Sequence, residues 1–209
     1  MNFYTFFLVG AAALISVAVA VPWKSLTEAK KLNFNSERAH VSMGKLSSSS
    51  FSFKDCGGPS AALKGDVSIS PSDPITLPGK LTVSFNASIN VDLKSPLKAV
   101  LKIKKKEFVW VDVPCVDGFG SCTYNDVCSM LPPLPPAGCP PPLKKRGVPC
   151  RCPIKAGKYS LPPSVFVVPV IKDIPEFLAD GDYQVNVKLY YGATELGCAD
   201  MAFSLKLNE

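Results

Sequence analysis

A cysteine- and proline-rich stretch from Cys115 to Cys152 constrains most strongly what this chain can fold into. These 38 residues contain six of the eight cysteines and eight of the twenty prolines. Proline fixes φ and lacks a backbone donor, so regular strands and long helices are disfavoured there. Covalent bridges can order such a segment instead. We therefore predict a disulfide-stapled loop region, set into a fold that the rest of the chain builds from β-strands.

The N-terminal residues have the pattern of a secretory leader. The apolar run from Phe6 to Val21 is short for a membrane span, and small residues at Ala18 and Ala20 suit signal-peptidase cleavage. We expect residues 1–20 to be a signal peptide. An uncleaved anchor is the alternative, because the first five residues include no Lys or Arg. Residues 21–50 lack apolar periodicity, and we expect a flexible N-terminal extension or a removable pro-segment.

Eight cysteines in an oxidising compartment predict four disulfides, although sequence alone leaves their pairing open. A structural zinc site is disfavoured, because Cys150 and Cys152 are one residue apart and no Cys-x-x-Cys pair is present. We therefore expect no metal and no other cofactor.

Alternation of apolar and polar residues predicts an all-β fold. The clearest strand spans residues 81–91, where every second residue is apolar. Further strands are predicted at 67–69, 97–104, 109–113, 159–161, 165–168, 183–191 and 197–207. Thr123-x-x-Asp126 has the spacing of a capping box and predicts one short helix from Val127 to about Leu131. Residues 51–209 should thus form an antiparallel β-cup or sandwich of about seven or eight strands.

Two apolar segments are candidates for contact with lipid. Phe108 and Trp110 lie near the apex of a predicted hairpin, where amphipathic rings would suit a membrane interface. Packing beneath a neighbouring loop is the alternative. Residues 170–178 form an apolar loop that either caps the core or touches lipid. The rim hypothesis comprises Phe108, Val109, Trp110, Val170, Ile171, Ile174, Phe177 and Leu178.

Basic residues are a second feature that favours contact with a membrane. The net charge of +6 is modest, which suits an anionic membrane surface and argues against nucleic acid. We expect recruitment to anionic lipid through Lys102, Lys104–Lys106 and Lys144–Arg146, with an ordinary solvated face as the alternative.

Asn86-Ala87-Ser88 is an N-glycosylation sequon on the polar side of the predicted strand, where a glycan could be accommodated. An unused sequon is the alternative.

The sequence offers few residues that could form a catalytic site. The single histidine, His40, falls in the expected extension, so no Ser-His-Asp or Cys-His arrangement can be assembled in the core. Carboxylates such as Asp112, Asp117, Asp173 and Glu176 could in principle form a glycosidase pair, but surface carboxylates are the simpler interpretation. We expect a non-catalytic protein.

Several specific motifs resemble those of a known family. They are Cys150-Arg-Cys-Pro, Gly157-Lys-Tyr-Ser-Leu-Pro, Phe166-Val-Val-Pro, Asp73-Pro-Ile-Thr-Leu-Pro-Gly79, Ser95-Pro-Leu-Lys98, Gly120-Ser-Cys-Thr123 and Leu196-Gly-Cys198. From about Ser50 to Leu207 the chain resembles the ganglioside GM2 activator family of lysosomal sphingolipid-binding cofactors, which is related to wider lipid-recognition β-sandwich families. The resemblance implies the pairs Cys56–Cys198, Cys115–Cys122, Cys128–Cys152 and Cys139–Cys150.

The resemblance also implies a function. An apolar cavity in the β-cup would take the ceramide tails of a GM2-like ganglioside, lift the lipid from an anionic membrane and present its sugar headgroup to β-hexosaminidase A. The protein would travel through the secretory pathway to the lysosome, and secretion is a further destination. A secreted lipid carrier or lipid-recognition module without an enzyme partner is the alternative.

Overall fold

The computed structural model describes residues 50–131, 134, 136, 138–168 and 180–208. The predicted signal peptide, residues 21–49 of the predicted extension and the apolar loop 170–178 lie outside the described residues.

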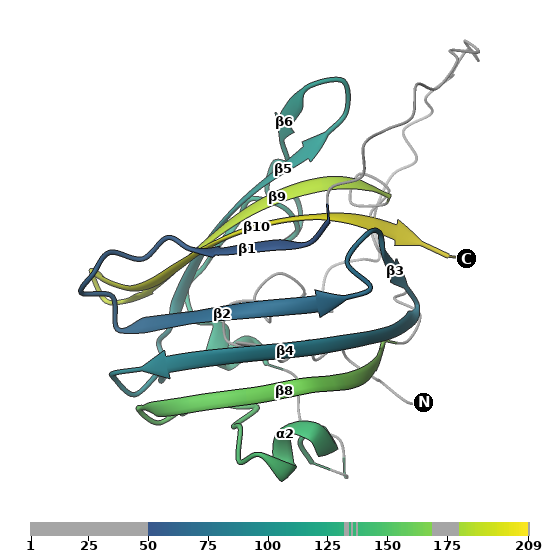
Figure 1. Ribbon diagram of the computed structural model, residues 1–209. Helices are drawn as coiled ribbons and strands as arrows, with labels where there is room; N and C mark the ends of the chain where they lie inside the picture. Colours follow the sequence, from purple (N-terminus) through teal and green to yellow (C-terminus); the bar gives the residue numbers. More distant parts are fainter. Residues whose placement is uncertain (1–49, 132–133, 135, 137, 169–179, 209) are drawn as a thin grey trace.

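Two β-sheets make up the fold (Figure 1). The large sheet has the strand order β1-β10-β9-β5-β6, with β3 beside β10 and β7 beside β5, and the small sheet has the order β2-β4-β8. The strands are β1 (Ser52–Asp55), β2 (Leu63–Ser70), β3 (Ile75–Leu77), β4 (Gly79–Ile89), β5 (Lys98–Lys106), β6 (Trp110–Asp112), β7 (Thr123–Tyr124), β8 (Gly157–Val168), β9 (Gly181–Tyr191) and β10 (Thr194–Leu207). The all-β prediction is confirmed.

Period-two burial explains why the strands form where the sequence predicts them. Along β4, Leu81, Val83 and Phe85 are buried while the residues between them face outward. Along β9, Val185 and Val187 alternate in the same way with Gln184 and Asn186. Each fully buried side chain of this size contributes about 1.5–3 kcal/mol. The two buried faces meet in one core between the sheets.

Strand β8 differs from the prediction. Pro162 and Pro163 were expected to separate two strands, but β8 runs unbroken through them. The register with β4 shifts here, so both prolines face the single residue Ser84 in a bulge. Among the described strands β8 pairs only with β4, and proline is tolerated at such an edge and at a bulge.

Strand β3 is an exception to the antiparallel pairing of the other strands. Residues 71–79 were expected to form a proline-rich edge or turn region, yet Ile75–Leu77 pair in parallel with the end of β10. Ile75 and Leu77 are both buried in the core, which accounts for a strand among so many prolines.

The helices also differ in detail from the prediction. Helix α1 (Val127–Met130) is present, but its N-cap is Asp126, whose carboxylate accepts from the backbone N–H of Cys128 at 3.1 Å. Thr123, the expected cap, lies in β7 instead. A second short helix, α2 (Pro141–Lys145), was not predicted. Proline suits the first turn of a helix, and fully buried Leu143 anchors α2 to the core.

The disulfides Cys56–Cys198, Cys115–Cys122, Cys128–Cys152 and Cys139–Cys150 are the pairs that the family resemblance implies. Two of them hold the helical segment, and Cys56–Cys198 joins the start of the described chain to β10 across 142 residues. In the chain-entropy model a loop of that length contributes about 5 kcal/mol by restricting the unfolded chain.

Candidate functional site

The interior between the sheets is closed at one end by small residues. Ala99, Gly197 and Ala199 occupy inward-facing positions near the β9–β10 turn, and all three are buried. A Cβ atom at Gly197 would lie 2.9 Å from the Cβ of Leu63, so the two sheets touch here. The disulfide between Cys56 and Cys198 fastens the same end. Small residues therefore allow the sheets to meet at this end, where the bridge joins the end of β1 to its neighbour β10 within the large sheet.

The other end of the interior carries larger and less covered apolar residues. Phe53 on β1 and Phe203, Leu205 and Leu207 on β10 pack against the core but are only partly buried. Phe203 stacks on Tyr183 of β9, with ring centroids 5.6 Å apart. Apolar side chains with exposed area are a surface that another apolar group can cover. The apolar interior is thus tightly packed at the Gly197 end and incompletely covered at the Phe203 end.

Tyr183 behaves as a neutral aromatic group at this end. Burial, together with the nearby negative charges of Glu107 and Asp180, raises the pKa of its phenol well above the ordinary value. Its hydroxyl therefore stays protonated at acidic and neutral pH, and its buried ring packs against Phe203.

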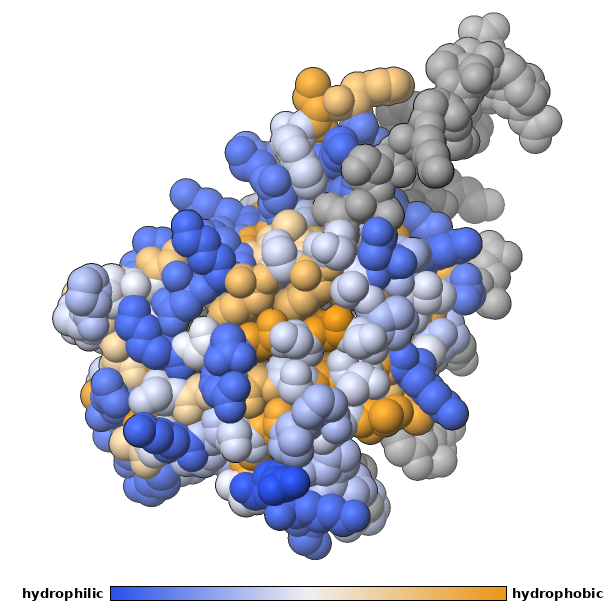
Figure 2. Space-filling view, viewed as in Figure 1, coloured by the Kyte–Doolittle hydropathy of each residue, from blue (hydrophilic) through white to orange (hydrophobic). Residues whose placement is uncertain are grey.

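The β5–β6 hairpin projects beyond the rest of the large sheet and ends in an apolar tip. The tip comprises Phe108, Val109 and Trp110. The exposed fraction is 99% for Phe108, 68% for Val109 and 37% for Trp110. Figure 2 shows this apolar projection at the top of the view. The predicted hairpin is present, and Phe108 stands in solvent rather than beneath a neighbouring loop. The remaining rim residues, Val170, Ile171, Ile174, Phe177 and Leu178, lie outside the described residues.

A buried carboxylate lies at the base of this tip. Asp182 is 4% exposed and stands directly opposite Lys106 on β5 and Ser204 on β10. Ser204 donates a hydrogen bond to it at 2.5 Å, and the Lys106 Nζ lies 3.9 Å from its second oxygen. Sequence reasoning missed this cluster, since an aspartate at the start of a strand resembles any turn residue. These contacts hold Lys106, the last residue of β5, against the large sheet, so the projecting tip begins after this residue.

The predicted basic residues do not form one surface. Lys102 and Lys104 are exposed on β5, beside the tip. Lys144, Lys145 and Arg146 are exposed on and after α2, which lies beyond the small sheet at the opposite side of the molecule (Figure 1). One flat membrane contact would therefore not reach both groups at once, and recruitment to anionic lipid stays a prediction.

The other predicted residues are placed as follows. Asn86 is exposed on the outer face of β4, away from the interior. Asp112 and Asp117 are exposed carboxylates, whereas Asp173, Glu176 and His40 lie outside the described residues. Within the described ranges, no cluster of three or more His, Cys, Asp or Glu could hold a metal ion. In that same part of the chain, no helix is long and apolar enough to cross a membrane.

Comparison with known proteins places the chain in a family. Residues 50–205 match the family model of the ML domain. The chain is 44% identical over 161 residues to the ganglioside GM2 activator of Macaca fascicularis, a match that covers 75% of this chain and 84% of the relative. It is 40% identical over 160 residues to the ganglioside GM2 activator of Mus musculus, covering 75% and 82%. A solved Niemann-Pick type C2 protein from the Japanese carpenter ant matches at 19% identity and a TM-score of 0.36, covering 74% of this chain and 99% of that one. The resemblance is thus confirmed: this chain belongs to the ganglioside GM2 activator family of ML-domain proteins.

Proposed function

We propose that this protein is a non-catalytic lipid-binding activator. It takes up the ceramide tails of a GM2-like ganglioside, lifts the lipid from the membrane and presents the sugar headgroup to β-hexosaminidase A. The family membership supports the lipid-binding activator role. The observation that carries the proposal is the apolar interior, closed at the Gly197 end and incompletely covered at the Phe203 end.

The energetics explain what an apolar interior contributes. Exposing acyl chain to water costs about 0.8 kcal/mol per CH₂ group, so a ceramide with about 30 such groups meets a cost of order 20 kcal/mol on leaving the bilayer alone. Contact with apolar side chains replaces the lost contact with lipid. Phe53, Phe203, Leu205 and Leu207 have exposed area that the tails would cover.

Membrane contact is assigned to the tip. Phe108, Val109 and Trp110 would enter the headgroup region. The rest of the proposed rim, residues 170–178, lies outside the described residues. Lys102 and Lys104 would approach an anionic surface at the same time, at about 1 kcal/mol per charge near the membrane. This orientation would turn the incompletely covered end of the interior towards the lipid.

The location follows from the proposed role. A leader at residues 1–20 would direct the protein into the secretory pathway, and the lysosome supplies both anionic lipid and ganglioside substrate. Residues 51–209 would be the mature lipid-binding domain.

Extraction of lipid tests the proposal. Vesicles containing GM2 and an anionic phospholipid are incubated with the purified protein and then removed by centrifugation. We expect GM2 in the supernatant, in proportion to the protein added and in complex with it by native mass spectrometry. A supernatant without lipid at saturating protein would contradict the proposal.

A further inference from the structure

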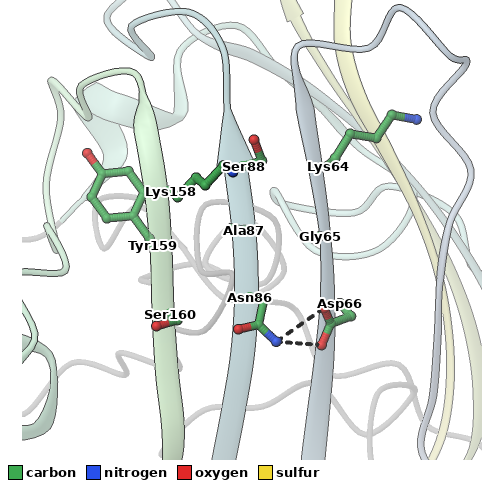
Figure 3. Close-up of a pocket in the computed structure, with 9 residues that line it drawn as sticks. All are labelled: Lys64, Gly65, Asp66, Asn86, Ala87, Ser88, Lys158, Tyr159 and Ser160. Carbon is green, nitrogen blue, oxygen red and sulfur yellow. Dashed lines mark hydrogen bonds between the residues drawn. The ribbon is translucent and has the colours of Figure 1, made fainter.

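The outer face of the small sheet is left open by the described part of the chain and is lined mainly by polar side chains. Strand β4 lies between β2 and β8, and Asn86 of β4 stands opposite Asp66 and Ser160 on its two neighbours. Figure 3 shows Asn86 and Asp66 side by side in front of the strands. In Figure 1, which views the same face, no described element crosses in front of these three strands.

The surroundings of Asn86 leave room for a bulky group. Several of the neighbouring outward-facing positions on the three strands carry short side chains, namely Ser68, Ser84, Ser88 and Ser160. The side chains of Lys64 and Lys158 border a shallow depression of about 420 Å³ that includes Asn86. The exposed apolar side chains of this outer face, Val165 and Val167 of β8, lie further along that strand than Ser160 and away from Asn86.

The sequence around Asn86 is an acceptor for one specific modification. Ser88 follows two residues later and therefore lies on the same face of the strand, and the residue between them is Ala87 rather than proline. The Nδ2 of Asn86 donates to the carboxylate of Asp66 at 3.3 Å. An amide nitrogen that carries a sugar keeps one hydrogen, so the glycosylated side chain can still donate to Asp66.

We propose that Asn86 carries an N-linked glycan, which lies over the outer face of β2, β4 and β8 and is held at its first amide by Asp66. The donor is a lipid-linked oligosaccharide pyrophosphate. The Asn86 Nδ2–sugar C1 bond forms, the C1–oxygen bond to the pyrophosphate breaks, one Nδ2 hydrogen leaves as a proton and the lipid pyrophosphate is the leaving group. The glycan marks this face as a solvent face, which belongs to a different sheet from the β5–β6 tip.

The first test is occupancy. The full chain is expressed in a eukaryotic secretory host, and the secreted protein is analysed by mass spectrometry. We expect one glycan on wild-type protein and on Ser84→Ala, a control serine two residues before the sequon asparagine, and none on Asn86→Gln or Ser88→Ala. Ser88→Ala keeps the Asn86–Asp66 contact, so it separates loss of the acceptor from loss of folding. An unmodified Asn86 in wild-type protein would overturn the proposal.

The second test locates the glycan against Asp66. A glycosidase that cleaves the amide converts Asn86 to aspartate, placing a second carboxylate beside Asp66, whereas an endoglycosidase that leaves one N-acetylglucosamine preserves the amide. At pH 7 we expect a lower Tm after the first treatment than after the second, because like charges at this distance repel. In Asp66→Asn the difference in Tm should shrink. An equal difference in wild-type and Asp66→Asn protein would overturn the role of Asp66.

Discussion

Replacing Phe108 with alanine should weaken binding to anionic vesicles about five- to thirtyfold while leaving the folded protein unchanged. The side chain of Phe108 is 99% exposed, so it contributes almost nothing to the core, and its whole surface is available to the membrane. Fully burying a phenylalanine is worth about 1.5–3 kcal/mol relative to leaving it in water. Partial burial in the headgroup region, with alanine as the reference, leaves about 1–2 kcal/mol, which converts to the stated factor.

The assay is sedimentation with vesicles of phosphatidylcholine and an anionic phospholipid, with the bound fraction measured against lipid concentration. Val165→Ala is the matched control, since Val165 is 58% exposed on the outer face of β8, in a different sheet from the tip. We expect wild-type binding for the control and an unchanged Tm for both variants. If Phe108→Ala binds vesicles as wild type does, the assignment of the hairpin tip to the membrane is wrong.

Three further predictions concern charge, packing and capping. Replacing Lys102 and Lys104 together with glutamate should weaken vesicle binding by about 2 kcal/mol or more and reduce its salt dependence. The same charge reversal at Lys144 and Lys145 of α2 should leave vesicle binding unchanged. Sedimentation at two ionic strengths measures both effects. Gly197→Val should destabilise the fold by about 1–3 kcal/mol in urea unfolding, because its side chain would press on Leu63 at 2.9 Å; a stability equal to wild type would mean that the sheets can separate there. Asp126→Ala should cost about 1 kcal/mol through loss of the α1 cap. Burial alone would raise the pKa of Asp126, but hydrogen bonds from Ser95, Leu97 and Cys128 lower it below the ordinary value of 3.8. The contribution of Asp126 to stability is therefore complete above that value, and it is lost only as the pH falls through the lowered pKa. The stability difference should therefore persist at pH 5 and vanish in strong acid, and its disappearance at pH 5 would contradict this reasoning.

The strands of the core could be predicted because burial leaves a period-two record in the sequence. Leu81, Val83 and Phe85 on β4 alternate with polar residues, and the structure buries them as the pattern indicates. Strand β5 follows the same rule, whereas all three residues of β6 are exposed, so the alternating valines at 109–113 located this strand without recording which of its faces is buried. The periodicity of a strand indicates which of its faces is buried, but it does not indicate which strand pairs with it.

The missed features depend on neighbours that sequence does not reveal. Pro162 and Pro163 fit within β8 because that strand lies at an edge and bulges against Ser84. Asp126 replaces Thr123 as the helix cap because Thr123 is held in β7 by pairing with β5. Asp182 is distinguished only by the two strands that flank it. In each case a tertiary contact decides the role of a residue whose local sequence is ordinary.

The central claim is that this protein makes membrane-bound ganglioside available to a soluble enzyme. The most direct measurement is the hydrolysis of liposomal GM2 by β-hexosaminidase A, with and without the purified mature protein, beside a control in which the protein is present and the enzyme absent. We expect hydrolysis that requires both proteins and falls with the Phe108→Ala variant. No stimulation by a protein that demonstrably extracts GM2 would contradict the activator role and favour a lipid carrier without this enzyme partner.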